Sequence, residues 1–415
     1  MKTENCKLYY LGFSHFLGIG PVKFSLLKKH FGSAKRAYLA DKKELVKTIG
    51  VVLTEKFVDF RNKFDPVKKM EELKKKEIMV LAVDDEDYPE SLRNISDPPI
   101  CIYLRGSIPK FFNAVGTPNP KSVKDLVSSP SRKAKTPVFE VYDLGDPPLG
   151  GEVDGKTRCR AFSQNLVFSI VGTRNPTQYG IQVARKFSYE LTEAGFTIVS
   201  GMAYGIDTIA HESCLEAGGK TIAVLGCGVD IIYPSSNRFL YERISHCGGA
   251  IISEFPPGQF VLKGLFIARN RIISALSRGV MIVEGAKDSG SLITARYAAT
   301  QGKDVFAPPN PITSVMSAAP NLLIKQGAKL VTSVEDIMEE FDMKITPKKK
   351  EDIKKKLNEI ERLIFEILEE KPILIDDLAI ILKKPISQVL NTLSLMEING
   401  LVEKNDENYY QIRLF

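Results

Sequence analysis

Three cations and an aromatic side chain lie within nine residues of one segment, KGLFIARNRIISALS. This segment supplies Lys263, Phe266, Arg269, Asn270 and Arg271. Cations can follow a phosphate backbone while an aromatic face stacks on an unpaired base, so the combination is typical of proteins that bind single-stranded nucleic acid. Phe266 can instead belong to a hydrophobic core, as a lone Phe in a helical segment often does, and the sequence leaves both interpretations open.

A second pattern suited to an anion is Gly172-Thr173-Arg174, which follows an apolar run. A turn of small residues lets a ligand approach the backbone, and arginine adds a planar, permanently charged guanidinium. The alternative is a tight turn between a strand and a helix, with a solvated arginine. The pattern lacks the GxGxxG spacing of dinucleotide-binding folds, and no cofactor is expected.

Two further segments place small residues and hydroxyl groups where strands should end. Gly201 and Gly205 lie in SGMAYGID, and Ser289, Gly290 and Ser291 lie at the start of an expected helix. Taken separately, the glycines can serve helix–strand packing and Ser289 can cap a helix. Because ligands gather at the carboxyl ends of parallel strands, these residues together predict a track for a polyanion along one rim of a sheet.

Signals for catalysis are weaker. His211 lies in a helical segment and is interpreted as structural, and neither a Ser-His-Asp order nor a metal-ligand spacing connects the acidic residues near strand ends. Asp230 and Glu254 can orient the arginines or act as catalytic carboxylates, and we favour the first role. Cys227 has no activating neighbour in the sequence. No catalytic residue and no metal site are therefore predicted.

Seven apolar runs between residues 166 and 335 supply the strands that would position these side chains. They are LVFSIVG, FTIVSG, TIAVLG, AIISEF, VMIVEG, KDVFAP and AKLVTS, and helix-length amphipathic segments separate them. Strands apolar enough to be buried on both faces, joined by helical crossovers, form a parallel sheet with helices on each side. The predicted fold class is α/β, with a Rossmann-like doubly wound parallel sheet.

This sheet domain is predicted to span residues 77–340, with a smaller unit on each side. Residues 1–63 read as short helices around Gly18-Ile19-Gly20-Pro21, which is either a plain turn or a phosphate-binding hairpin of the helix-hairpin-helix, SAM-like type. Residues 357–415 show three helices and a short hairpin, the plan of a winged helix. A lysine-rich linker at 341–356 precedes it, and a segment rich in Pro, Gly and Ser at 113–164 reads as an irregular insertion.

Charge is distributed unevenly over these units. Residues 1–63 contain 13 Lys and Arg against 5 Asp and Glu, residues 166–340 contain 15 against 15, and residues 357–415 contain 6 against 11. Attraction to phosphate should therefore concentrate in the N-terminal unit, whereas the acidic C-terminal unit should repel nucleic acid.

Length and composition exclude several classes of protein. A chain of 415 residues is too long for one ordinary core, and 44% hydrophobic residues argue against wholesale disorder. No apolar run approaches the roughly 18 residues that cross a bilayer, so no membrane association is expected. The N-terminus lacks a signal-peptide pattern and the six cysteines include no CxxC pair, which favours a reducing cytoplasm.

Several longer segments make the chain similar to a known family. IVGTRNPTQYG, SGMAYGIDTIAHESCLEAGGKTIAVLGCGVDIIYPSSN, SEFPPG, RNRIISALSRGVMIVEGAKDSGSLITARYAATQGKDVFA and NLLIKQGA resemble, in order, the motifs of the DNA-processing protein A (DprA/Smf) family. The resemblance covers roughly residues 80–106 and 166–335. The chain departs from the family pattern at 308–310 and 317–321, near the predicted rim.

The resemblance implies a non-enzymatic protein of natural transformation and DNA recombination. Such a protein binds single-stranded DNA, protects incoming strands and loads the RecA recombinase. The resemblance also implies a homodimer through the Rossmann domains and a DNA pocket that includes Gly172, Thr173 and Arg174, beside the segment from Lys263 to Arg271.

Two other functions remain as alternatives. Rossmann-like folds include the LOG-type phosphoribohydrolases, which cleave a base from a nucleoside monophosphate, but their PGGxGTxxE pattern is not reproduced by GAKDSGSLITA. A sequence-specific regulator acting through the winged helix is disfavoured by the acidity of that unit.

Overall fold

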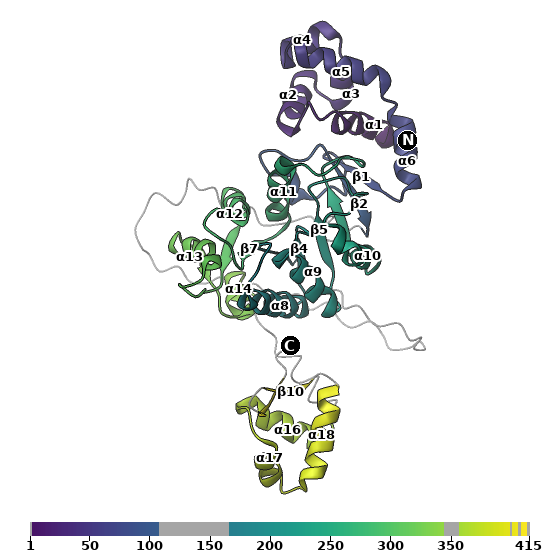
Figure 1. Cartoon of the computed structure of the whole chain (residues 1–415). Coiled ribbons are helices and arrows are strands. Elements are labelled where there is room, and N and C mark those ends of the chain that lie inside the picture. The colour runs from purple at the N-terminus through teal and green to yellow at the C-terminus, as the bar shows by residue number, and fades with distance from the viewer. Residues whose placement is uncertain (1, 108–165, 344–356, 399–400, 406–407, 413–415) are drawn as a thin grey trace, which may run out of the picture.

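The computed structural model describes residues 2–107, 166–343, 357–398, 401–405 and 408–412. The predicted insertion at 113–164 and the linker residues 344–356 lie outside this set, as does Gly400, which the sequence analysis placed at the turn of the C-terminal hairpin. Figure 1 shows the described elements along the chain.

The N-terminal helices pack around one aromatic core. They are α1 (Lys2–His15), α2 (Pro21–Phe31), α3 (Ala34–Leu39), α4 (Lys42–Ile49), α5 (Val51–Lys63) and α6 (Pro66–Lys75). Phe13 and Phe57 are fully buried and stack with their ring centroids 5.1 Å apart. Pro21 occupies the first helical position of α2, as predicted, because its missing N–H costs nothing there. Helix α6 lies in the interval 64–76, which the sequence analysis assigned to neither unit.

A nine-stranded sheet forms the centre of the molecule, with the order β1-β2-β6-β5-β4-β3-β7-β8-β9. The strands are β1 (Met79–Ala82), β2 (Cys101–Gly106), β3 (Val167–Val171), β4 (Thr197–Ser200), β5 (Thr221–Val224), β6 (Ala250–Ser253), β7 (Gly279–Ile282), β8 (Asp304–Ala307) and β9 (Lys329–Leu330). Strands β3 to β9 pair in parallel and match the seven predicted runs, so the predicted fold class is confirmed. Strand β2 extends this sheet antiparallel to β6, and β1 pairs antiparallel with β2 at the outer edge.

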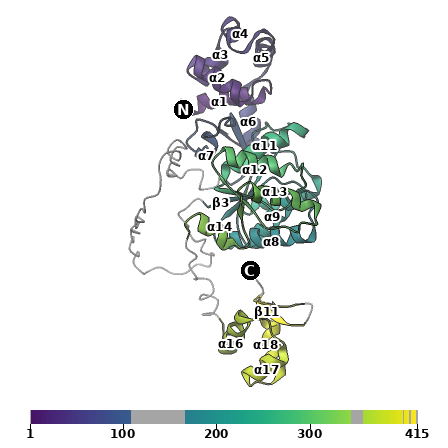
Figure 2. The ribbon, with the colours of Figure 1, turned by 90° about the vertical axis from the view of Figure 1, so that its left-hand side faces the viewer.

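Helices cover both faces of the sheet. They are α7 (Glu90–Arg93), α8 (Gln178–Glu193), α9 (Ile206–Glu216), α10 (Arg238–His246), α11 (Lys263–Leu276), α12 (Ser291–Thr300), α13 (Ala318–Lys325) and α14 (Val334–Glu340). In Figure 2, α11 and α12 lie above β3 while α9 and α8 lie below it. Every residue of β3, β5, β6 and β7 is buried, as expected for strands between two helical layers.

Ion pairs join the N-terminal helices to the edge of the sheet. Lys28 of α2 lies 2.6 Å from the carboxylate of Asp84, and Lys7 of α1 lies 2.8 Å from Asp85, with both carboxylates just after β1. Lys7 also donates to the carbonyl of Val80 in the edge strand, which occupies an outward-facing backbone acceptor.

The C-terminal elements form the predicted winged helix. Helices α16 (Glu359–Glu370), α17 (Ile375–Leu382) and α18 (Ile386–Ile398) precede the antiparallel strands β10 (Val402–Lys404) and β11 (Tyr410–Ile412). They share a separate buried core that includes Phe365 and Leu393. Within the described ranges, no helix is long and apolar enough to span a bilayer.

Candidate nucleic-acid interface

The loops that follow β3, β4 and β7 are bonded to one another at the carboxyl edge of the sheet. The Thr173 N–H donates to the carbonyl of Glu284 at 2.8 Å, and the Ile206 N–H donates to the carbonyl of Thr173 at 3.2 Å. The turn at Gly172-Thr173-Arg174 is thereby held between its neighbours. This is the edge at which ligands bind in doubly wound sheets.

Aromatic rings and a cation meet above this edge. The guanidinium of Arg174 lies 5.4 Å from the ring centroid of Phe266, and the Tyr233 ring lies 5.6 Å from Phe266. Phe266 rests on Gly226, where an added Cβ would come within 2.8 Å of the ring. Phe266 is half-buried, Arg174 is exposed and Tyr233 is 41% exposed. The group therefore presents a supported aromatic surface with an adjacent positive charge.

Helix α11 adds further side chains to this surface. Lys263 is exposed in its first turn, three residues before Phe266, and Asn270 follows four residues after Phe266, so the three share one stripe of the helix. Asn270 donates to the carbonyl of Gly290 at 3.4 Å, at the start of α12. The stripe thus runs from an open cation to an amide beside the next loop.

Arg269 is buried, although the sequence analysis placed it among the side chains that contact DNA. It is 4% exposed, and its Nη1 donates to the carbonyls of Gly201 and Val224 at 2.6 and 2.5 Å. Burial lowers the pKa of Arg269, and the neighbouring charge of Asp207 opposes that shift. Arg269 therefore ties α11 to the ends of β4 and β5.

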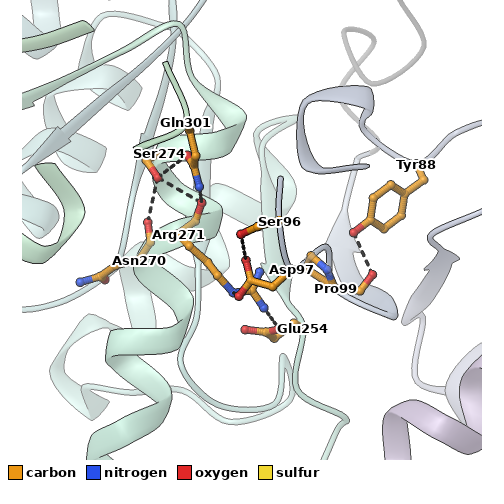
Figure 3. Close-up of polar contacts among 9 residues, drawn as sticks. All are labelled: Tyr88, Ser96, Asp97, Pro99, Glu254, Asn270, Arg271, Ser274 and Gln301. Atoms are coloured by element: carbon orange, nitrogen blue, oxygen red, sulfur yellow. Dashed lines mark hydrogen bonds and ion pairs between the residues drawn. The ribbon is translucent and has the colours of Figure 1, made fainter. Parts of the chain in front are cut away.

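Arg271 is also buried, and its guanidinium is shared by two carboxylates (Figure 3). Its Nη2 pairs with Glu254 and its Nε lies 3.0 Å from Asp97. Burial raises the pKa of Glu254, an effect that the charge of Arg271 opposes. Glu254 therefore orients an arginine, the role favoured from the sequence, whereas Asp230 accepts from the Gly258 N–H at 2.8 Å.

The predicted glycines serve close approach within the protein. An added Cβ at Gly172 would lie 2.7 Å from Ile206, and one at Gly201 would lie 2.0 Å from Arg269 Nη1. Gly205 has a φ of 74°, and its Cβ would lie 2.5 Å from the carbonyl oxygen of Thr173. These positions require glycine for packing, the alternative that the sequence analysis left open.

The hydroxyl groups at the start of α12 bond to each other. Ser289 Oγ lies 2.7 Å from Ser291 Oγ and accepts from the Ser291 N–H at 3.3 Å, while Gly290 is exposed between them. Ser289 is partly exposed and Ser291 is buried. The structure thus brings these residues to the same edge as Asn270, at the far side of the stripe from Lys263.

A carboxylate of the protein occupies the first turn of α8. Glu284 accepts from the Thr177 N–H at 2.9 Å and from its hydroxyl at 2.6 Å, and an added Cβ at Gly180 would lie 2.1 Å from its Oε2. In dinucleotide-binding sheets, the corresponding helix start receives a phosphate. An internal anion already fills that position in this protein.

The other titratable groups considered from the sequence are bonded inside the fold. His211 is fully buried against the hydroxyl of Thr221 at 2.6 Å, and burial lowers the pKa of the His211 imidazole to about 3. Burial raises the pKa of the Cys227 thiol to about 11. A neutral imidazole and a protonated thiol are suited to packing. Among the described residues, no group of three His, Cys, Asp or Glu is placed to hold a metal ion.

The segment that departs from the family pattern is anchored to the strands. Asn310 is buried and donates to the carbonyls of Val283 at 3.1 Å and Pro308 at 3.0 Å. Asn321 donates to the carbonyl of Asn310 at 3.2 Å.

The sequence analysis did not include Tyr233 among the candidate site residues. The signal that could have identified it was an isolated aromatic residue in the loop after TIAVLG.

Two sequence families match most of the described chain. The DNA recombination-mediator protein A family matches residues 144–342, and the DprA winged helix domain matches residues 348–406. Protein Smf of Synechocystis is 37% identical over 333 residues, which are 80% of this chain and 71% of that protein. DNA processing protein DprA of Streptococcus pneumoniae is 45% identical over 174 residues, which are 42% of this chain and 61% of that protein.

A solved structure has the same fold. The X-ray structure of DNA processing protein A from Streptococcus pneumoniae superposes with a TM-score of 0.59 at 28% identity, covering 82% of this chain and 99% of that chain.

Proposed function

Because the chain belongs to the DprA/Smf family of DNA-processing recombination mediators, we propose that it binds single-stranded DNA at the carboxyl edge of its sheet. In this proposal it protects incoming strands during natural transformation and loads the RecA recombinase onto them. It works without a catalytic step, in the cytoplasm.

The observation that carries the proposal is the aromatic surface of Phe266 and Tyr233 beside Arg174. An exposed ring on a rigid support can stack on a base, and every base has a face to offer, so stacking does not require a particular sequence. A paired base inside a duplex already has both faces stacked. The surface is therefore suited to single strands.

The side chains of the interface divide into two roles. Lys263 and Arg174 are exposed and would neutralise phosphates, while Asn270 and Ser289 would donate hydrogen bonds at the other end of the stripe. The buried arginines hold the helix and strands that present these groups. This second role replaces the direct contacts expected for Arg269 from the sequence.

A nucleotide-processing enzyme is the less favoured alternative. Such an enzyme would bind the phosphate of its substrate at a helix start next to the sheet, and Glu284 fills that position at α8 with a negative charge. A second anion there would be repelled.

A homodimer is proposed from exposed apolar side chains near one end of the sheet. Ile312 is 93% exposed and Val315 is 73% exposed before α13, and Leu330 is exposed on the edge strand β9. Apolar groups in this density mark interaction sites, and an edge strand can extend a sheet across two copies.

The winged helix is proposed to contact protein, either the sheet domain of its own chain or a partner such as RecA. Helix α18 contains no Lys or Arg, and Ile386, Leu390 and Leu395 are exposed on it. An acidic unit with an aliphatic face is poorly suited to a phosphate lattice.

A gel shift that compares single-stranded and duplex DNA of equal length tests the proposal, together with an assay of nucleotide hydrolysis. Preferred binding of the single strand without hydrolysis supports a mediator. Hydrolysis of nucleoside monophosphates with weak binding of both DNA forms would support the enzyme.

A further inference from the structure

We propose that Asp97, Arg271 and Glu254 form a clamp around a buried guanidinium that fixes the position of α11, so that Arg271 is a positioning residue for strand binding and contacts no phosphate. The inference rests on the proposed function, because α11 carries the stripe that would bind DNA. It differs from the direct role that the sequence suggested for Arg271.

The clamp joins three parts of the chain that are far apart in sequence. Arg271 lies on α11, Glu254 follows β6, and Asp97 lies in the loop between α7 and β2. Figure 3 shows the two carboxylates meeting the guanidinium from the side of the sheet and from the α7 loop. The side chains of Arg271 and Glu254 are 4% and 8% exposed, so water screens their pairing little.

The opposite side of Arg271 is fixed to the next helix. Its carbonyl accepts from Gln301 Nε2 at 3.0 Å, and Gln301 Oε1 accepts from Ser274 Oγ at 2.7 Å. One turn of α11 is thus held by the sheet edge, by the α7 loop and by the end of α12. Because Phe266 and Lys263 lie on the same rigid helix, a rotation there would move both.

The α7 loop is itself bonded back to the N-terminal helices. Buried Tyr88 donates to the carbonyl of Pro99 at 2.9 Å, and Arg93 donates to the carbonyls of Val83 and Asp85 at 2.9 and 2.6 Å. Asp85 pairs with Lys7 of α1. The loop that supplies Asp97 is therefore anchored to the end of β1 and, through Asp85, to α1. Through this loop the clamp gives the β1–β2 extension a part in strand binding.

Charge balance explains why Arg271 is not available to a phosphate. Its guanidinium already faces two carboxyl groups, those of Asp97 and Glu254. A phosphate brought to this guanidinium would have to displace one of them. Exposed Lys263, in contrast, can exchange bound counterions for a phosphate.

Substitution of Asp97 separates this inference from simple electrostatics. Asp97→Asn removes a negative charge near the interface, and by charge alone it should tighten binding to DNA. The clamp predicts weaker binding to DNA instead, because α11 loses its contact with Asp97. Asp288→Asn is the matched control, since Asp288 is an exposed acid in the loop before α12.

The experiment measures the affinity of the full chain for a fluorescent oligothymidylate over a range of salt concentrations. Asp97→Asn and Arg271→Lys are expected to weaken binding at least about threefold at every salt concentration with an unchanged slope, as residues acting at a distance do. Asp97→Glu should recover most of the loss, and Asp288→Asn should bind at least as well as the unaltered protein. Lys263→Ala should lower the slope of log affinity against log salt by about 0.7.

Two results of the binding experiment would overturn the clamp. One is a slope for the neutral variant Arg271→Gln that falls as much as that of Lys263→Ala, which would make Arg271 a phosphate ligand. The other is normal or tighter binding by Asp97→Asn.

Amide hydrogen exchange measured without DNA tests the clamp independently of the proposed function. The clamp predicts faster exchange across 263–276 in Asp97→Asn and not in Asp288→Asn. If the unaltered protein fails to bind single strands, the proposed function fails, while unchanged exchange in Asp97→Asn refutes the clamp itself.

Discussion

Replacement of Phe266 by alanine tests the role of the aromatic surface. The ring is half-buried on Gly226, faces Tyr233 at 5.6 Å and lies 5.4 Å from the guanidinium of Arg174. Stacking of one base on an aromatic side chain contributes about 1–3 kcal/mol. Since 1.4 kcal/mol corresponds to tenfold in affinity, Phe266→Ala should weaken single-strand binding by about tenfold or more.

Fluorescence anisotropy with a labelled oligothymidylate measures this loss, and thermal unfolding shows whether the variant stays folded. Phe239→Ala is the matched control, because Phe239 is a 74% exposed aromatic with an arginine, Arg243, 5.8 Å from its ring. Helix α10 carries that pair on the face of the sheet opposite to α11. Phe239→Ala should leave single-strand affinity unchanged.

Normal affinity in a folded Phe266→Ala protein would refute the stacking role and assign Phe266 to packing on Gly226. An equal loss in Phe239→Ala would show that the assay reports exposed aromatic surface in general. Phe266→Tyr should bind nearly as well as the unaltered protein, because it keeps the ring face.

Three further predictions follow from the burial and charge of other residues. Lys263→Ala and Arg174→Ala should each lower the slope of log affinity against log salt concentration by about 0.7. Arg174→Lys should not recover full affinity, because a point charge cannot bind a phosphate through two parallel hydrogen bonds. Unchanged slopes in the alanine variants would exclude this interface. Arg269→Ala should destabilise the protein by about 3 kcal/mol or more in urea unfolding, because it leaves two carbonyls and a buried carboxylate without compensation, and wild-type stability would contradict its burial. Truncation after Asp342 should keep single-strand affinity within about threefold, a change below 1 kcal/mol, while RecA-dependent activity falls. Truncation after Lys356 is the control for loss of the lysine-rich linker. DNA binding by the isolated winged helix at physiological salt would refute the argument from its acidic charge.

The parallel strands of the sheet could be predicted because each one has a recognisable local sequence pattern. Runs such as TIAVLG and AIISEF are apolar on both faces, which is what a strand between two helical layers requires. The pairing of β2 with β6 could not be read in the same way. It depends on which strand edge is left open after the parallel strands have assembled, and no local pattern records that.

The residues of the interface also fall into those that local sequence predicts and those that it does not. Spacing alone places Lys263, Phe266 and Asn270 on one stripe of a helix, and the structure has them there. The arginines could not be distinguished from exposed cations, because the partners that bury them are remote. Arg271 pairs with Asp97, which lies more than 170 residues earlier in the sequence. Residue type predicted a positive charge, and only the fold shows where that charge is used.

The measurement that tests the central claim most directly is photo-crosslinking of the full chain to an oligothymidylate that carries 5-iodouracil, followed by mass spectrometry of the crosslinked peptides. The proposed interface predicts crosslinks at Phe266 or Tyr233 that an unlabelled single strand competes away and an equal length of duplex does not. Crosslinks confined to the N-terminal helices or to the winged helix, with none at these two rings, would contradict it.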